Sequence, residues 1–406
     1  MHVLFIAPDF PSYQQHFVRA LKSAGAKVSG IGDRPAEHMP EEVKRQLDAY
    51  YQISNVTDTQ ALLECVRYVQ SQEWVDRLEA TIESHMLAAA EVREACTIPG
   101  MSFEQTWICR DKTTMKQFMQ ERGIPCAAFT AADSVEQVQT FVEKVGYPII
   151  VKPRDGAGAS ATWRCNGPQD LMPAIEDTGI DKGNSAALEE FIEGHEGFYD
   201  TLVAGGKIQH DFVSHYYPNV LEAMRTRWIS PYIIVTNRSD LPDYQPLKEL
   251  GQKVIQDIGL QNVPTHMEWF AGEKGLKFSE IGARPPGVGQ WDLYCAANDI
   301  DLYKEWADTV LYGQCHGVLS RRYSAAILSL RPNQDGKIHG YTGVEQVMQQ
   351  YGEWIINCHF PETGTPTQPI NAGYMANAWI QIKYPDYDEL RTILMDIANK
   401  ITVYAG

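Results

Sequence analysis

The sequence predicts a mixed α/β and α+β protein, and three features of the chain support this prediction. At the N-terminus, strand patterns at residues 3–7 and 28–31 flank a helical pattern over 13–25, which gives a strand–helix–strand order. Near residues 265–281, two short strand patterns surround a glycine-bounded turn. From about Cys315 onward the chain becomes rich in strand patterns and takes on α+β character.

The composition is that of an ordinary globular protein with an acidic balance of charge. The 406 residues suffice for two or three domains, and 44% of them are hydrophobic and 21% charged. The net charge of −17 argues against general binding of nucleic acids or anionic membranes, although a nucleotide needs only a few local positive charges. The eight cysteines are scattered without a CxxC pair, which favours free thiols in a reducing cytosol. The first apolar run is too short for a signal peptide and no later run could span a bilayer, so we expect a cytoplasmic protein.

The first hundred residues predict a small Rossmann-like unit. Residues 3–7 form a continuous apolar run, typical of a buried parallel strand. A further strand is expected within 74–82, between helices at 61–70 and 85–96. Because the unit has no GxGxxG motif, we predict no dinucleotide site. Glu83 directly follows the strand, where side chains tend to face ligands, but the sequence favours a solvated carboxylate at this position.

The next part of the chain predicts a lysine at the end of a strand, followed by a loop of small residues. Asp111 caps a helix over 112–122, and Ser134 caps another helix that ends at Val145. The strand that follows ends at Lys152. Residues 154–161 (RDGAGASA) would let backbone amides approach phosphate oxygens closely, although most glycine clusters are simply turns.

The later elements follow the same kinds of pattern. An apolar strand carrying two carboxylates is expected at 186–192 (AALEEFI), with a strand pair around Gly205. Helices are expected over 247–258 and 299–311. The C-terminal part adds strands at 323–330, 352–357 and 375–382 and a helix over 387–402.

The stretch from His266 to Gly289 carries the clearest chemical signal. It places Glu268 and Glu280 on the two strands of a predicted hairpin, with Arg284 a few residues later. On adjacent strands the two carboxylates would lie close enough to share a divalent cation, and a neighbouring guanidinium suits metal-bound phosphate. An ordinary hairpin with surface carboxylates is the alternative interpretation of this stretch alone.

In their order along the chain, these motifs resemble those of the ATP-grasp superfamily, in the branch with biotin-carboxylase-like enzymes and carboxylate–amine (L-amino acid) ligases. The motifs are Asp111-Lys112, Val151-Lys152-Pro153 with its loop, residues 189–196 (EEFIEGHE), Glu268, and residues 280–284 (EIGAR). The resemblance spans essentially the whole chain. It implies a Rossmann-like pre-ATP-grasp domain (1–110), an ATP-grasp domain (111–314) with a lid subdomain at about 125–205, and a C-terminal α+β domain (315–406).

The resemblance also assigns roles by position. Glu268 and Glu280 would hold Mg²⁺, with Mn²⁺ as an alternative, and Arg284 would stabilise the transferred phosphoryl group and the acyl phosphate. Residues 189–192 would be the adenine hinge, and Glu196 would bond the ribose hydroxyls. The residues that would bind ATP are Lys112, Lys152, Gly156, Gly158, Ala159, Ser160, Glu189, Glu190, Phe191, Ile192 and Glu196.

One position departs from the family pattern. Family members commonly carry Asn two residues after the second metal-binding Glu, and this chain has Gly282 there, which leaves the number of bound metal ions open. The chain also lacks the Gln-Val-Glu-His set of biotin carboxylases, and Pro286 replaces the histidine of purine-pathway members. By elimination, the chain resembles ligases that activate a small-molecule carboxylate with ATP and join it to an amine. Two alternative functions remain: a regulatory protein that binds ATP without turnover, and a small-molecule kinase. A homodimer is a separate expectation about assembly.

The segment 210–228 is expected to contact the substrate, because such ligases place a variable loop between the hinge and the metal hairpin. Arg225 or Arg227 would clamp a substrate carboxylate, since a guanidinium fork matches carboxylate geometry. His215 is a weaker candidate in the same segment. Arginines that merely balance an acidic surface are the alternative.

Overall fold

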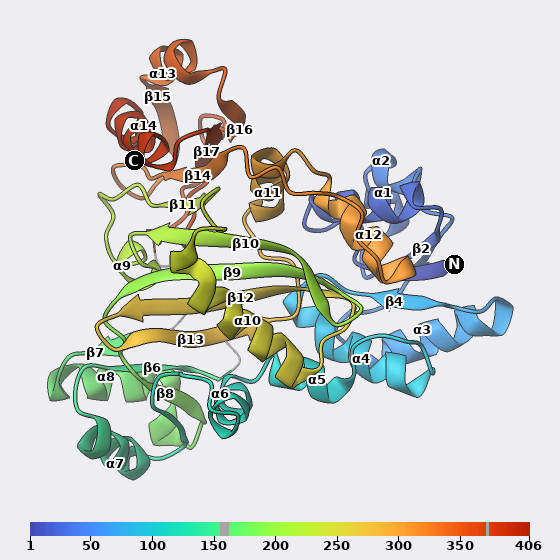
Figure 1. The fold of residues 1–406 in the computed structure, drawn as a ribbon, viewed down its shortest axis with the longest axis horizontal. Coiled ribbons are helices and arrows are strands. Elements are labelled where there is room, and N and C mark those ends of the chain that lie inside the picture. The colour runs from blue at the N-terminus through green and yellow to red at the C-terminus, as the bar shows by residue number, and fades with distance from the viewer. Residues whose placement is uncertain (155–161, 371–372) are drawn as a thin grey trace.

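The computed structural model describes residues 1–154, 162–370 and 373–406, and an antiparallel sheet of eight strands forms its centre (Figure 1). The strand order is β13-β12-β9-β10-β11-β14-β17-β16, and each neighbouring pair is antiparallel. The bounds are β9 (His195–Ala204), β10 (Lys207–Tyr217), β11 (Tyr232–Val235), β12 (Val263–Gly272), β13 (Gly275–Gly282), β14 (Ser324–Leu330), β16 (Ile355–His359) and β17 (Ala378–Tyr384).

A separate parallel sheet forms the N-terminal part, as the strand–helix–strand pattern predicted. Its order is β3-β2-β1-β4, with helices packed against it, and β1 is buried along its whole length. Phe17 packs edge-on against Trp306 at 4.9 Å between ring centroids, which joins this part to the helix α12. The bounds are β1 (His2–Ile6), α1 (Gln14–Ser23), β2 (Lys27–Gly32), β3 (Ala49–Gln52), α3 (Thr59–Gln72), β4 (Arg77–Glu79), α4 (Met86–Ala95) and α12 (Leu302–Tyr312).

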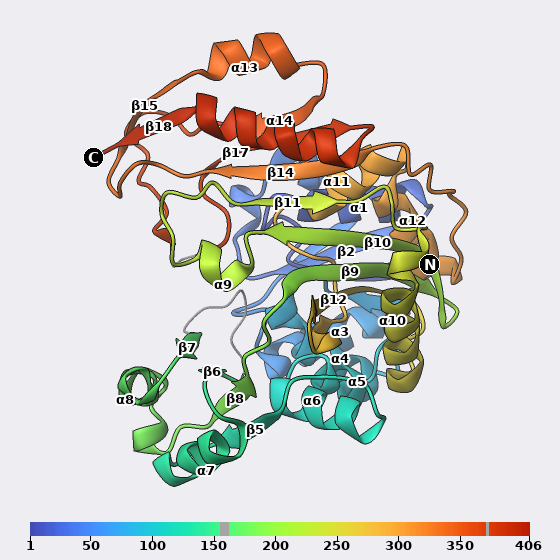
Figure 2. The same ribbon diagram turned by 60° about the vertical axis from the view of Figure 1, so that its left-hand side comes forward.

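A small four-stranded sheet with two helices projects from the central sheet (Figure 2). Its order is β5-β8-β6-β7, and Val138, Phe141 and Ile175 belong to its own apolar core. The predicted strand that delivers Lys152 is confirmed as β6, whereas the helix α8 was not predicted. The bounds are β5 (Phe129–Ala132), α7 (Val135–Val145), β6 (Ile149–Pro153), β7 (Trp163–Cys165), α8 (Pro168–Thr178) and β8 (Ala186–Glu190).

The C-terminal strands continue the central sheet. β14 pairs with β11 along Ala325↔Val235 to Leu328↔Tyr232, and the helix α14 (Tyr387–Lys400) packs on the far side with α13 (Val344–Tyr351). The predicted boundary between residues 314 and 315 therefore falls between α12 and β14, while the hydrogen-bonded sheet runs across both of the predicted parts. The division of the chain into domains remains a prediction.

One segment differs from its predicted structure. Residues 210–217 were expected within a substrate-facing loop, but they belong to the central strand β10. Both faces of β10 are buried, from Phe212 to Tyr216, so the sequence shows no alternation of polar and apolar residues there. Only the part after Pro218 forms a connection, which carries the short helix α9 (Val220–Ala223). Within the described residues, no helix combines the length and apolar character needed to cross a bilayer.

Candidate active site

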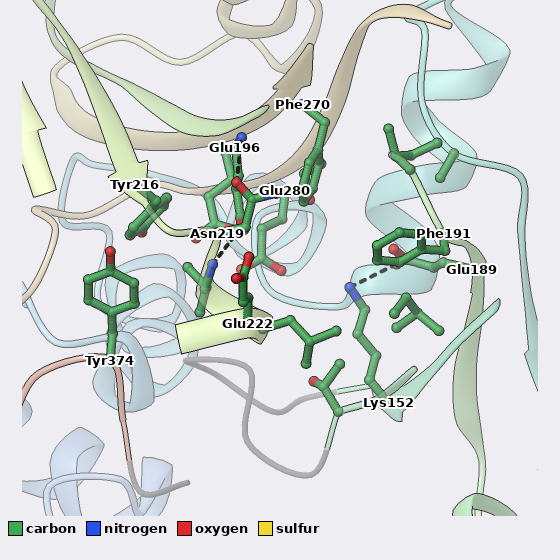
Figure 3. Close-up of a pocket in the computed structure, with 18 of the residues that line it drawn as sticks. Lys152, Glu189, Phe191, Glu196, Tyr216, Asn219, Glu222, Phe270, Glu280 and Tyr374 are labelled. Carbon is green, nitrogen blue, oxygen red and sulfur yellow. Dashed lines mark hydrogen bonds and ion pairs between the residues drawn. The ribbon is translucent and has the colours of Figure 1, made fainter. Parts of the chain in front are cut away.

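A cavity of about 860 Å³ opens between the small sheet and the central sheet, and it contains most of the predicted site residues. Its walls come from β6 and β8 on one side and from β9, β12 and β13 on the other. Figure 3 shows Lys152 and Glu189 facing Glu196 and Glu280 across this space. The C-terminal part also contributes Tyr374, which the sequence did not indicate.

The hairpin places its two carboxylates opposite each other, as predicted. Glu268 and Glu280 are register partners on β12 and β13, which brings Cβ atoms of such pairs to roughly 5 Å. Lys112, at the start of the helix α6 (Lys112–Glu121), lies 3.5 Å from the Glu280 carboxylate. Burial opposes ionisation of Glu280, but Lys112 and Lys152 outweigh it and lower the pKa of this carboxyl. Glu280 is therefore an anion at neutral pH.

Glu189 sits between two lysines. Its carboxylate lies 3.0 Å from the Lys152 ammonium and 3.3 Å from that of Lys116, and all three side chains are nearly buried. Burial raises the pKa of Glu189, but the two lysines outweigh this effect and lower the pKa to about 2. The sequence did not indicate Lys116, because its contact with Glu189 spans 73 residues of chain.

The predicted hinge lines the cavity beside this cluster. The Glu190 amide donates to the Ala128 carbonyl at 2.8 Å, and the Glu190 carboxylate pairs with Lys274. The Arg164 guanidinium stacks over the Phe191 ring, with its Cζ 3.9 Å from the centroid. Such a stacked pair beside a cavity is suited to hold a planar base.

Glu196 lies next to the hairpin carboxylates. It accepts a hydrogen bond from the Val220 amide at 2.7 Å, and it is buried. Burial first, and then the charges of Glu268 and Glu280, raise its pKa to about 8. Because burial is the larger cause and the neighbouring carboxylates add to it, Glu196 holds a proton at neutral pH.

Arg284 is held by a carboxylate from the N-terminal part. Its Nε and Nη2 donate to one oxygen of Glu83, at 2.9 and 2.6 Å, and Arg110 donates to the other oxygen at 2.9 Å. Glu83 begins a short turn (Glu83–His85) after β4 and lies on the cavity wall, so the favoured expectation of a solvated carboxylate was wrong. Instead of a solvated carboxylate, Glu83 is a bridge between two guanidinium groups.

A histidine–carboxylate cluster lies on the same sheet face as Glu268. His266 Nδ1 is 2.7 Å from Asp200 Oδ1, and His266 Nε2 is 3.8 Å from Glu268 Oε1. Burial lowers the pKa of His266, but Asp200 and Glu268 outweigh it and raise the pKa to about 9. The sequence did not indicate this cluster. Its one signal was the spacing of two between His266 and Glu268, which puts both side chains on one face of a strand.

The structure separates the three predicted substrate residues. Arg225 lines the cavity, where burial and the nearby Arg164 lower its pKa. Arg227 is outside the cavity lining and pairs with Asp335 in the C-terminal part. His215 is buried on β10 between His195 (2.9 Å) and the Tyr244 hydroxyl (2.8 Å), and burial lowers its pKa to about 3. The four loop residues Gly156, Gly158, Ala159 and Ser160 lie outside the described residues.

Comparisons with known proteins agree with this arrangement. Residues 117–299 match the ATP-grasp domain family. The chain is 27% identical over 305 residues to the L-arginine-specific L-amino acid ligase of Bacillus subtilis, covering 74% of this chain and 73% of that protein. Its fold resembles the crystal structure of an L-amino acid ligase from Bacillus licheniformis (TM-score 0.77, 17% identity, covering 100% and 98% of the two chains). It also resembles N5-carboxyaminoimidazole synthetase from Staphylococcus aureus complexed with ADP (TM-score 0.72, 16% identity, 98% and 96%).

Residues 117–299 therefore carry an ATP-grasp domain, and the fold of the chain is similar to that of an L-amino acid ligase. The relatives that it resembles are named as ligases and synthetases.

Proposed function

We propose that the protein joins an amino-acid-like carboxylate to an amine through an acyl phosphate, with release of ADP and phosphate. The observation that carries this proposal is the hairpin, which sets Glu268 opposite Glu280 in a cavity that also holds Lys152 and Arg284. The relative named as an L-arginine-specific L-amino acid ligase supports amino acids as the substrate class.

The carboxylates of the hairpin fit a divalent cation such as Mg²⁺ or Mn²⁺. They are hard oxygen donors that face one cavity, and their side chains are partly buried at 20% and 30% exposed. A cation there would also offset the charges of Glu268 and Glu280, which add to the burial that raises the pKa of Glu196. When bound by Glu268 and Glu280, the cation would neutralise charge on the phosphoryl oxygens.

The lysines of the cavity would bind the ATP phosphates. Burial lowers the pKa of Lys152, but Glu189 and Glu280 outweigh it and raise that pKa, so the ammonium keeps its charge. Glu189 and Glu280 also fix the directions of the Lys152 and Lys112 side chains. Phosphates would then meet cations that are already oriented, which lowers the entropic cost of binding.

Arg284 would stabilise the charge that develops during phosphoryl transfer. A guanidinium fork matches the equatorial oxygens of a phosphoryl group, and Glu83 and Arg110 limit the orientations of this fork. Arg225, also on the cavity wall, is the candidate that would bind a substrate carboxylate.

The test is the release of ADP and phosphate with ATP, Mg²⁺ and pooled amino acids. Release of both products that depends on a carboxylate and an amine supports the proposal. Release of ADP with a phosphorylated alcohol as the product would identify a kinase instead. Bound ATP without any turnover across a broad amino-acid panel would identify a nucleotide-binding regulator.

Trapping the intermediate gives a sharper test. An acyl phosphate is open to attack at its carbonyl carbon, so hydroxylamine with ATP and the correct carboxylate should yield a hydroxamate. Arg284→Ala should lower the hydroxamate yield by about a hundredfold, the scale for removing one donor to a developing anion. Arg284→Lys should restore only part of the yield, because an ammonium cannot form the bidentate contact. Arg227→Ala is the matched control, since Arg227 lies outside the cavity lining, and its yield should equal that of the unmodified protein.

A further inference from the structure

His266 is a largely buried histidine whose side chain reaches the cavity. Its side chain is 14% exposed and lines the cavity, on the same strand and face as Glu268. Its register partner on β13 is Gly282, which has no side chain. At this level of the hairpin, therefore, only β12 presents a side chain toward the cavity, and that side chain is an imidazole.

Two contacts fix the imidazole. Asp200 on β9 holds Nδ1 at 2.7 Å, and the other Asp200 oxygen accepts a 2.6 Å hydrogen bond from the Tyr294 hydroxyl. The Phe198 ring lies against the imidazole at 4.9 Å between centroids. Asp200 is 2% exposed, so neither of its oxygens depends on solvent for a partner. A carboxylate that holds Nδ1 in this way orients the ring with Nε2 turned away from Asp200, which is the orientation found behind metal-ligating histidines.

The Nε2 nitrogen points toward the hairpin carboxylates. His266 Nε2 lies 3.8 Å from Glu268 Oε1, longer than a hydrogen bond but within the span of two ligands on one ion. Among the described residues, one group of three possible metal ligands has its ligand atoms within 4.8 Å of one another. It consists of His210, Glu305 and Cys315, which do not line the cavity. Glu280 does not lie within that distance of both His266 and Glu268, so ligation of one ion by all three side chains would require Glu280 to move closer.

We propose that His266 is a nitrogen ligand of the divalent cation that Glu268 and Glu280 hold, with Asp200 as its positioning residue. This proposal rests on the metal site of the proposed function. A proton on Nε2 and the cation compete for the same lone pair. An imidazole ligand favours ions such as Mn²⁺ and Co²⁺ over Mg²⁺, which prefers oxygen, so the chain should discriminate between these ions more strongly than a site made of oxygens alone.

The experiment measures the ligand directly. The full chain is loaded with Mn²⁺ and ADP, and electron spin-echo modulation detects ¹⁴N nuclei bound to the ion. We expect imidazole ¹⁴N modulation in the unmodified protein and its loss in His266→Asn, which can offer only an amide. His339→Asn, which removes an exposed imidazole on the strand β15 (Ile338–Thr342), is the matched control and should keep the modulation.

Two further variants test the geometry. Asp200→Asn should keep the modulation but weaken Mn²⁺ binding by about 10–100-fold, the range for losing such a partner. In His266→Asn/Gly282→Asn, an amide oxygen from β13 should restore Mg²⁺ binding without restoring ¹⁴N modulation. A side chain at Gly282 is tolerated, because its Cβ would first meet the Arg284 side chain at 3.4 Å.

The outcomes separate this inference from the proposed function. If Mn²⁺ binds with ADP and Glu280→Gln abolishes that binding, but the ¹⁴N modulation is absent or survives His266→Asn, the histidine is no ligand and the ligase proposal stands. If Mn²⁺ does not bind with ADP at all, both the metal site and the ligand assignment are overturned.

Discussion

Replacing Glu189 by Gln should lower the free energy of unfolding, by an amount that follows from the lowered pKa of Glu189. The carboxylate compensates two lysines whose side chains are 3% and 13% exposed, and Gln keeps its shape but removes its charge. A pKa lowered from 4.5 to about 2 corresponds to about 3 kcal/mol of folding free energy at neutral pH. Leaving buried charges without their partner costs about 3–5 kcal/mol in other proteins, which is the same scale.

The pH dependence follows from the direction of this shift. Because the pKa of Glu189 is lower in the folded protein, its stabilisation is complete above the unfolded value near 4.5. The stabilisation is lost as the pH falls toward about 2, where the folded carboxylate itself takes up a proton. The difference in unfolding free energy between the unmodified protein and Glu189→Gln should therefore be largest at neutral pH and shrink between about pH 5 and 2.

Urea unfolding at several pH values measures this difference. Other carboxylates titrate in the same range, so the quantity to follow is the difference between the two proteins rather than either curve alone. Glu353→Gln, at an exposed position before β16, is the control and should unfold with the unmodified protein at each pH. A difference for Glu189→Gln below about 1 kcal/mol at pH 7, the value expected of an exposed pair, would refute the reasoning. A difference that stays constant as the pH falls would refute it as well.

Three further predictions concern the site. Glu280→Gln should abolish turnover while leaving the thermal unfolding midpoint nearly unchanged, and calorimetry should find ADP binding weakened less than catalysis, because the metal-bridged charge matters most in the transition state. Glu83→Gln should lower kcat by about tenfold or more through a loosened Arg284 fork, measured by steady-state kinetics, with little change in ATP affinity. Arg225→Ala should raise the KM of one substrate by about tenfold or more, whereas Arg227→Ala should leave KM unchanged, since its partner is Asp335. Equal KM values for the two arginine variants would contradict the assignment of Arg225.

The parts of the site that the sequence predicted are those that short stretches of chain determine. The register of Glu268 with Glu280 follows from a hairpin whose turn is four residues long, and Lys152 follows from a strand that ends just after it. The sequence could not indicate the contacts between distant segments. Lys116 meets Glu189 across 73 residues, and Arg284 meets Glu83 across 201, so no local pattern connects them.

The error at residues 210–217 has a different cause. A strand with one solvated face alternates polar and apolar residues, but β10 lies inside the sheet and is covered on both faces. Its polar residues His210, Ser214 and His215 then looked like a substrate-facing loop. Each of the two histidines has a partner within the protein instead: His210 lies 3.3 Å from Glu305, and His215 lies between His195 and Tyr244. Polar side chains in a sequence can therefore belong to a buried strand when other parts of the fold supply their hydrogen-bond partners.

The charge of the cavity explains how an acidic protein would bind a nucleotide. Glu196, Glu268 and Glu280 converge on one floor, and the charges of Glu268 and Glu280 add to the burial that raises the pKa of Glu196. Phosphates alone would be repelled by this floor. With a divalent cation between the carboxylates and the phosphates, each negative group gains a positive neighbour, while Lys112 and Lys152 approach from the opposite side. The carboxylates that repel free phosphate would therefore favour a nucleotide that carries a divalent cation. The site would thus prefer metal-bound ATP, in which the cation already neutralises part of the phosphate charge.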